Sequence, residues 1–260
     1  MSKRNPHKVS FFPAGLDEYL ASLCPPETPA MQWVREYNEE QVDDPLIARF
    51  PIEHHQGHLL AVEMLEAARE HKVEMADRPF RILEIGTYLG YSTQWLAYYL
   101  PKMLGEHGWQ IDTFEMNEQF ADIAREGFER AGLGHKIKVH VGRALDELTK
   151  AKFENDSFDA AFIDADKSGY WGYAEESHRV LAPDKKAYFD NVFLMLQPLR
   201  PREELEALGE SGKDFLAIQV FNEMMRTSKK WLSHPLTPND GMTKAIAIKP
   251  DGRYGRALSL

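Results

Sequence analysis

Three residues near the ends of two apolar segments have side chains suited to holding a hard cation. Asp164 follows the apolar run of FDAAFIDADK, and Asp190 with Asn191 ends KAYFDN. Two carboxylates and one amide offer oxygen ligands, which suit magnesium, manganese or calcium better than zinc or copper. They leave coordination positions that water and two adjacent oxygens of a substrate could fill. The spacing alone equally allows Asp164 to cap a helix and Asp190 with Asn191 to form an ordinary turn.

A glycine turn upstream is suited to holding a ligand. The stretch FRILEIGTYLGYSTQWL has an apolar run that ends at Gly86, a second glycine at Gly90, and then the first turn of a helix. This pattern predicts strand, turn and helix, an arrangement that brings backbone N–H groups close to a ligand. The spacing Gly-x-x-x-Gly differs from the Gly-x-Gly-x-x-Gly of dinucleotide oxidoreductases, which argues against that class. An ordinary strand-to-helix turn is the alternative.

Strands and helices must bring the glycine turn and the possible cation ligands together. Glu115 ends the next apolar segment, IDTFEM, where doubly wound folds place a carboxylate against ribose hydroxyls. Apolar strand patterns alternate with helical ones, which predicts a parallel sheet with helices on both faces. We therefore expect Gly86, Glu115, Asp164 and Asp190 to meet at one edge of the sheet. The expected strands are 82–85, 111–116, 138–141, 158–163 and 187–189, and the expected helices are 93–100, 118–130, 145–150 and 173–180.

These motifs together resemble the cation-dependent, S-adenosylmethionine-dependent O-methyltransferases that include catechol and caffeoyl-CoA O-methyltransferases. The resemblance rests on LEIGTYLGYS, the strand-ending Glu115, FIDADK and FDN, and runs from Phe80 to Asn191 with a weaker echo at 239–248. It implies an α/β fold: a single doubly wound, Rossmann-like class I methyltransferase domain with a mostly parallel sheet. It also implies closing antiparallel strands around 231–234 and 243–248, and a helical N-terminal extension.

The resemblance also implies roles for individual residues. Lys167 is expected to take the proton of the acceptor hydroxyl, while Asp164 is expected to serve catalysis as a cation ligand and to contact the cofactor. Asp190 and Asn191 complete the implied metal set. The residues implied to bind S-adenosylmethionine are Glu84, Gly86, Tyr88 and Ser92 at its methionine part, Glu115 at the ribose, and the backbone around Ala144 at the adenine.

The expected reaction is methyl transfer from S-adenosylmethionine to a hydroxyl of a catechol-like small molecule. A phenol has a pKa near 10, so a divalent cation, Mg²⁺ or alternatively Mn²⁺ or Ca²⁺, would favour the reactive phenolate. In-line displacement needs no covalent enzyme intermediate, and orientation supplies most of the catalysis. Two alternatives remain: the same chemistry on a hydroxylated RNA nucleoside, and a non-catalytic cofactor-binding protein.

The sequence departs from the family pattern in three places. The segment PDKKAYFDN stands where the family usually has a Gly-Gly turn before the fifth strand. Ala144 lacks the small hydroxyl that the family often has near the adenine. The segment 192–240 matches little, and we expect it to form an insertion on the acceptor side.

Several other side chains have more than one interpretation. Tyr170, Trp171, Tyr173 and Trp231 could sandwich a planar acceptor or could be core or dimer contacts. Asp166 could hold the cofactor or only shape its loop. The residues His54, His55 and His58 are clustered, which suggests zinc, a ligand contact or a solvated helix start.

Composition narrows the class of protein. The 260 residues are 43% hydrophobic and 28% charged, with a formal net charge of −10, which argues against nucleic acid as the main partner. No apolar run reaches membrane-spanning length, MSKRNPHKVS has no apolar core, and the single Cys24 cannot form an internal disulfide. We expect a soluble cytoplasmic protein, with a helical extension or lid at 1–50 and the methyltransferase domain at 51–260. The resemblance implies a homodimer.

Overall fold

The computed structural model describes residues 15–75 and 77–258. The part of the predicted N-terminal extension at 1–14 lies outside these residues. The chain divides into two compact units, the first comprising Met1–Phe80 and Thr87–Arg143 and the second comprising Arg81–Gly86 and Ala144–Leu260. The predicted domain boundary near residue 50 stays a prediction.

The strands form one seven-stranded sheet in the order β3-β2-β1-β4-β5-β7-β6. The pairs β2–β3, β1–β4 and β4–β5 are parallel, whereas β7 pairs antiparallel with both β5 and β6. The predicted α/β, Rossmann-like class with antiparallel closing strands is therefore confirmed. The strands are β1 (Phe80–Ile85), β2 (Trp109–Glu115), β3 (Ile137–Val141), β4 (Phe158–Ile163), β5 (Leu181–Asp190), β6 (Trp231–Leu236) and β7 (Met242–Ala247).

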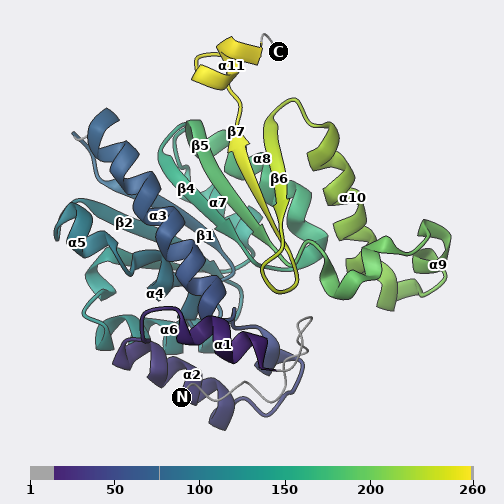
Figure 1. Ribbon diagram of the computed structural model, residues 1–260, viewed down its shortest axis with the longest axis horizontal. Helices are drawn as coiled ribbons and strands as arrows, with labels where there is room; N and C mark the ends of the chain where they lie inside the picture. The colour runs from purple at the N-terminus through teal and green to yellow at the C-terminus, as the bar shows by residue number, and fades with distance from the viewer. Residues whose placement is uncertain (1–14, 76, 259–260) are drawn as a thin grey trace. The chain divides into compact units, whose positions relative to one another are not determined.

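In the first unit, helices pack on the β2–β3 pair and on one another. The helix α6 (Glu118–Arg130) starts at Asn117, whose side chain accepts the N–H groups of Gln119 and Phe120, and it buries Phe128. The helix α2 (Pro29–Gln41) packs against α6 (Figure 1). The other helices of this unit are α1 (Leu16–Ser22), α3 (His54–Glu74), α4 (Tyr91–Ala97) and α5 (Leu100–Leu104).

The helix predicted at 93–100 ends earlier, and a second helix begins at its expected end. Helix α4 ends at Ala97, and α5 begins at Leu100 with Pro101 in its first turn. A proline is tolerated there, since the N–H that it lacks would have no partner within the helix.

In the second unit, β1, β4, β5, β7 and β6 lie side by side, and α10 (Lys213–Thr227) lies beside β6 (Figure 1). The predicted insertion at 192–240 is largely helical, with a 3-10 segment η4 (Leu194–Leu199) and a short helix before α10. The remaining helical elements described in this unit are α7 (Ala144–Ala151), η3 (Lys167–Gly169), α8 (Tyr170–Val180), α9 (Arg202–Glu206), η5 (Gly209–Gly212) and α11 (Arg253–Leu258).

The strand β5 is longer than predicted. It begins at Leu181 instead of residue 187, and its pairing with β4 shifts between Phe158↔Leu181 and Ala160↔Lys186. Asp184 takes a positive φ of 65° in this irregularity, and its carboxylate accepts the backbone N–H of Arg253. The strand is therefore continuous through the segment where the resemblance implied a Gly-Gly turn, and its pairing with β4 is irregular there.

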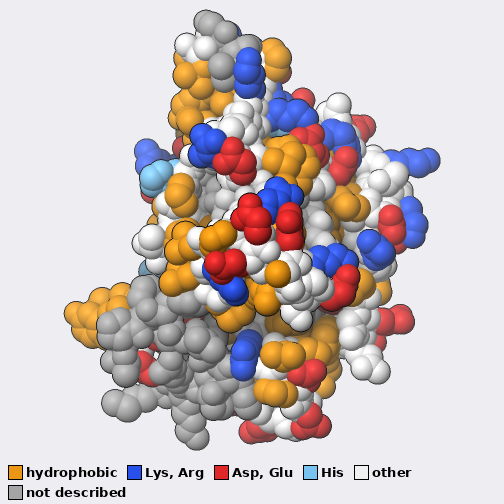
Figure 2. Space-filling view, turned by 90° about the vertical axis from the view of Figure 1, so that its right-hand side faces the viewer, with side chains coloured by type: hydrophobic (Ala, Val, Ile, Leu, Met, Phe, Trp, Pro, Cys, Tyr) orange, Lys and Arg blue, Asp and Glu red, His pale blue; other side chains and the backbone are white. Residues whose placement is uncertain are grey.

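No helix within the described parts of the chain combines the length and the apolar character that crossing a membrane requires. Acidic and basic side chains are interleaved with hydrophobic ones on the face that carries α9 and α10 (Figure 2). Much of this interleaving consists of neighbouring ion pairs, such as Arg202 with Glu206 and Arg226 with Glu223. The side chains that Figure 2 colours by type therefore form no broad basic field for a phosphate backbone.

Candidate active site

Three predicted residues of the second unit lie at the carboxyl ends of adjacent parallel strands. Gly86 follows β1, Asp164 follows β4, and Asp190 ends β5. The Asp164 N–H donates to the Ile85 carbonyl at 2.8 Å. This bond extends the hydrogen bonding between β1 and β4 to the edge of the sheet where Asp164 lies. The sequence-based expectation that these strand ends meet is confirmed within this unit.

Gly86 is required where these strand ends approach. Its φ is +100°, and a Cβ at this position would lie 1.9 Å from the Asp164 carbonyl oxygen. No L side chain fits such a space without moving the backbone. The glycine therefore keeps the chain after β1 tight against the start of the loop that carries Asp164.

Lys167 lies at the centre of a hydrogen-bonded cluster in the second unit. Its Nζ donates to Asp164 Oδ1 at 3.0 Å, to Asn191 Oδ1 at 2.8 Å and to the Tyr170 hydroxyl at 2.7 Å. The Lys167 side chain is 12% exposed and that of Asp164 is 18% exposed, so the ion pair is largely shielded from water. Asn191 has a φ of 55°, a conformation that asparagine tolerates better than most residues.

Tyr170 supports this cluster from beneath. It is fully buried, its hydroxyl donates to the Asp190 carbonyl oxygen at 2.7 Å, and its ring packs edge-on against Phe221. Burial, followed by the negative charge of Asp164, raises the pKa of Tyr170 well above its usual value. Its hydroxyl therefore keeps its proton and can act only as a neutral hydrogen-bonding group. No sequence pattern predicted this role for Tyr170.

Two of the three predicted oxygen donors face one cationic group. Asp164 and Asn191 each accept a hydrogen bond from the Lys167 ammonium, and Asp190, the last residue of β5, is buried directly before Asn191. Such oxygens fit a hard divalent cation. Within residues 15–75 and 77–258, no three His, Cys, Asp or Glu side chains are grouped to hold a metal. The predicted set depends on the Asn191 amide, and its role as a metal site stays a prediction.

The three clustered histidines do not form a zinc site, since no such group exists among the described residues. They lie in the first turns of α3, as a helix start would require, but all three are only partly exposed. The Nε2 of His54 bonds the Pro25 carbonyl at 2.8 Å, and the Nε2 of His58 bonds the Tyr99 hydroxyl at 3.1 Å. These contacts connect α3 to its neighbours within the first unit.

The structure separates the loop aromatics that were possible acceptor platforms. Tyr170 and Trp231 are buried in the second unit, and Trp231 packs against Phe189. Tyr173 is also buried, with its hydroxyl on Asp166. The interpretation of these three as a sandwich for the acceptor is wrong, because the core covers their rings. Trp171 is only half-buried, so the prediction for it stays open.

Asp166 shapes its loop. Its carboxylate accepts the Gly169 N–H at 3.1 Å and the Ser168 hydroxyl at 2.8 Å, in addition to the Tyr173 hydroxyl. These bonds cap η3 and hold the turn that carries Lys167. Of the two interpretations left open by the sequence, the structure supports the one in which Asp166 orders the loop.

Further predicted cofactor residues in the second unit are Glu84 and Ala144. Glu84 is fully buried in β1, opposite Phe162 of β4. Ala144 begins α7, where the first-turn N–H groups of a helix are available to a ligand. These locations neither support nor contradict the predicted contacts of Glu84 and Ala144 with the cofactor, which stay predictions.

The first unit holds the remaining predicted cofactor residues. Glu115 ends β2, and its carboxylate accepts the Tyr88 N–H at 2.7 Å and the Asn117 N–H at 2.8 Å. Burial raises the pKa of Glu115, while these N–H groups act in the opposite direction. Ser92 is buried in the first turn of α4. The carboxylate is thus fixed by two backbone donors, as a ribose-binding residue would need to be.

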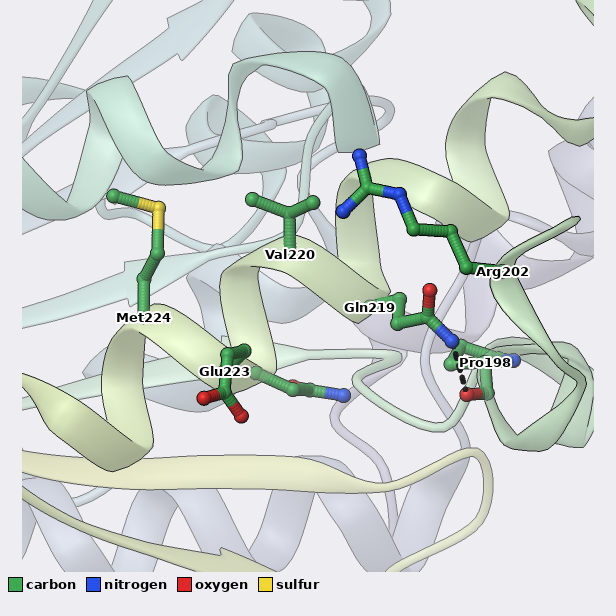
Figure 3. Close-up of a pocket in the computed structure, with 7 residues that line it drawn as sticks. Pro198, Arg202, Gln219, Val220, Glu223 and Met224 are labelled. Carbon is green, nitrogen blue, oxygen red and sulfur yellow. Dashed lines mark hydrogen bonds between the residues drawn. The ribbon is translucent and has the colours of Figure 1, made fainter. Parts of the chain in front are cut away.

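A hollow of about 440 Å³ lies on the helical insertion of the second unit (Figure 3). Gln219 crosses one end of it and donates to the Pro198 and Arg200 carbonyls, both at 3.1 Å. Asn222 Nδ2 donates to the carbonyl of Val192, the residue after Asn191. This bond ties α10 to the loop that follows the predicted metal ligands. The sequence offered no motif for this hollow, which is lined by Pro198, Arg202, Gln219, Val220, Asn222, Glu223 and Met224.

The fold is that of the S-adenosylmethionine-dependent methyltransferases. The solved O-methyltransferase TomG from Streptomyces achromogenes, involved in tomaymycin synthesis and in complex with S-adenosylmethionine, superposes with a TM-score of 0.74 at 26% identity. That likeness covers 90% of this chain and 96% of TomG.

A profile described as O-methyltransferase matches residues 30–248. The chain therefore belongs to the O-methyltransferase family, and the predicted resemblance is confirmed. It is 38% identical over 112 residues to a catechol O-methyltransferase of Niastella koreensis, covering 43% of this chain and 48% of that protein. It is 36% identical over 115 residues to caffeoyl-CoA O-methyltransferase 2 of Zea mays, covering 43% and 42%. The matched segments thus span about half the length of these relatives.

Proposed function

We propose that this protein transfers a methyl group from S-adenosylmethionine to a hydroxyl of a catechol-like small molecule with the help of a divalent cation. The observation that carries the proposal is the cluster in which Lys167 contacts oxygens of both Asp164 and Asn191. The names of the catechol and caffeoyl-CoA relatives support the same acceptor class, a vicinal dihydroxy aromatic.

The residues that would hold the cation are Asp164, Asp190 and Asn191. A bound Mg²⁺ would stabilise the phenolate form of a coordinated hydroxyl, as it stabilises hydroxide over water. The donor chemistry fits that ion, because carboxylate and amide oxygens are hard ligands. Manganese or calcium would suit the same set.

Lys167 is the proposed general base. In this structure Nζ donates to Asp164, Asn191 and Tyr170, so it would first have to release a proton to solvent. As a neutral amine it would then accept the hydroxyl proton of the acceptor, and the carboxylate of Asp164 beside it would stabilise the ammonium that forms. Tyr170 does not compete for this proton, because its raised pKa keeps it neutral. Its fixed hydroxyl instead limits where Nζ can lie.

We propose that the cofactor is held by the residues that the resemblance implies. Of these residues, Tyr88, Ser92 and Glu115 belong to the first unit, and Glu84, Gly86, Ala144 and Asp164 belong to the second. Glu115 is the best supported, because its carboxylate is oriented by two backbone N–H groups. Hydrogen bonds from ribose hydroxyls to such a carboxylate would be charge-assisted.

Other assignments have less support. Methylation of an RNA nucleoside needs a surface that attracts phosphates, whereas the net charge is −10 and the face in Figure 2 alternates in sign. A non-catalytic cofactor-binding protein would have no need of the Lys167 cluster. Homodimerisation and a cytoplasmic location remain predictions.

The experiment is a methyl-transfer assay with labelled S-adenosylmethionine and Mg²⁺. The acceptors are matched pairs of vicinal diols and their monophenol analogues. We expect turnover of the diols alone, because only they offer two adjacent oxygens to one cation. Equal turnover of the monophenols would overturn the cation-bridged acceptor, and no turnover of any phenol by protein that binds the cofactor would overturn the acceptor class.

A further inference from the structure

Helix α2 of the N-terminal region contains a buried polar side chain, the amide of Asn38, that apolar packing alone does not account for. Asn38 is 1% exposed, its Nδ2 donates to the Ala48 carbonyl at 3.0 Å, and its Oδ1 accepts the Tyr88 hydroxyl at 2.7 Å. Burying an amide is unfavourable unless it is hydrogen-bonded, so both bonds are needed to keep it there. The apolar contacts of α2, such as Val34 against Gly127, would seat the helix without it.

Tyr88 lies in the glycine turn after β1, in a backbone conformation that its side chain does not favour. Its φ is 48°, in the left-handed region. Such a conformation persists only where the surroundings determine it. The ring meets Phe50 and Phe120 edge-on at centroid distances of 5.4 and 4.9 Å, and Asn38 holds its hydroxyl.

The backbone of Tyr88 in turn orients Glu115. Its N–H donates to Glu115 Oε2 at 2.7 Å, so the residue whose side chain Asn38 holds also fixes one oxygen of this carboxylate. The Asn117 N–H fixes the other oxygen at 2.8 Å. A chain of contacts therefore runs from Asn38 through the Tyr88 hydroxyl, ring and backbone to the Glu115 carboxylate, all within the first unit.

We propose that Asn38 is a positioning residue for cofactor binding, which rests on the proposed role of Glu115 at the ribose. Asn38 contacts no cofactor in this scheme. It fixes the side chain of Tyr88, so that the N–H of residue 88 holds Glu115 ready to accept ribose hydroxyls. The N-terminal region thereby belongs to the working parts of the cofactor site and is more than a lid.

The test is a double-mutant cycle on the affinity for S-adenosylhomocysteine, measured by calorimetry with the full chain. Asn38→Ala removes the acceptor, Tyr88→Phe removes only the hydroxyl, and the third variant carries both changes. We expect each single variant to bind about 5- to 30-fold more weakly, a change of about 1–2 kcal/mol at 1.36 kcal/mol per tenfold, in the lower part of the cost of leaving a buried group unsatisfied. The double variant should bind no more weakly than the weaker single variant, because both changes break the same bond.

The matched control is Thr28→Ala, which removes the N-cap of α2, where Thr28 accepts the Met31 N–H at 3.2 Å. It should lower the thermal unfolding midpoint and leave the affinity unchanged, which separates loss of helix stability from loss of positioning. Affinity within twofold of the unmodified protein for Asn38→Ala or Tyr88→Phe would overturn the proposal. Additive losses in the double variant would overturn it as well.

Two further outcomes distinguish this inference from the function on which it rests. If the unmodified protein does not bind S-adenosylhomocysteine, the proposed function fails and this inference fails with it. In the second outcome, the unmodified protein binds S-adenosylhomocysteine and Glu115→Ala abolishes this binding, but the Asn38 variants bind as the unmodified protein does. Only the inference about Asn38 then fails.

Discussion

Replacing Tyr170 by phenylalanine removes one hydroxyl from beneath the Lys167 cluster and leaves the buried ring in place. The lost group donates to the Asp190 carbonyl and accepts from Lys167 Nζ, both at 2.7 Å. Removing one partner of a buried hydrogen bond costs about 1–3 kcal/mol, and a bond to a charged group contributes about 1.5–3 kcal/mol. Because one hydroxyl serves both bonds, we expect a loss of about 2–4 kcal/mol in unfolding free energy.

The assay is urea unfolding of the unmodified protein and of Tyr170→Phe, with the denaturant slope compared to confirm that the same surface unfolds. Turnover should fall as well, because Nζ loses the acceptor that restrains it, whereas affinity for the cofactor should hold. Tyr254→Phe is the control, since Tyr254 is 39% exposed and should shift stability by no more than about 0.5 kcal/mol. A Tyr170→Phe protein as stable as this control would refute the reasoning.

Two more predictions concern the second unit and the glycine turns. Gly86→Ala should lower the free energy of unfolding by on the order of 3 kcal/mol, because its Cβ would collide with the Asp164 carbonyl. Gly132→Ala, at a φ of +69° in open space, should lower it by about 1 kcal/mol. Equal shifts in the thermal unfolding midpoint of the two variants would contradict this. Burial, and then Lys249 and Lys230, lower the pKa of His178, so the unfolded state binds its proton more readily. The stability that neutral His178 contributes is present above about pH 6.5 and is lost as the pH falls. The difference in unfolding free energy between the protein and His178→Gln should therefore shrink from pH 7.5 to 5.5, and pH-independent differences would exclude this.

The sequence was sufficient for the sheet and its site edge because the signals are local. Apolar runs mark β1, β2 and β4. Gly86 and Asp164 directly follow β1 and β4, and Glu115 is the last residue of β2. Parallel pairing then places the ends of neighbouring strands together. The antiparallel β6–β7 pair came from the family resemblance and not from these local patterns.

What the sequence did not show depends on contacts between distant residues. Tyr170 fits an acceptor platform as readily as a buried support, and only its bond to Asp190, 20 residues further on, decides between them. The bond between Asn38 and Tyr88 spans 50 residues and follows no periodic pattern.

The sequence also did not predict the unusual backbone conformation at residues 194–196. Leu194, Met195 and Leu196 all have positive φ, although no glycine or asparagine marks the run. The Met195 N–H bonds the Asp240 carboxylate at 2.8 Å, a partner from the loop between β6 and β7. Propensity rules describe single residues in isolation, so they miss a conformation that a distant carboxylate stabilises.

The central claim is that oxygens of Asp164, Asp190 and Asn191 hold a divalent cation that activates the acceptor hydroxyl. The most direct measurement is methyl transfer from S-adenosylmethionine to a catechol before chelation, after excess chelator, and after Mg²⁺ is restored, with Asp190→Ala alongside. We predict that turnover falls to background with chelator and returns with Mg²⁺, and that Asp190→Ala stays inactive throughout. Turnover that persists in excess chelator, or an Asp190→Ala protein that responds to Mg²⁺ as the unmodified protein does, would contradict the account.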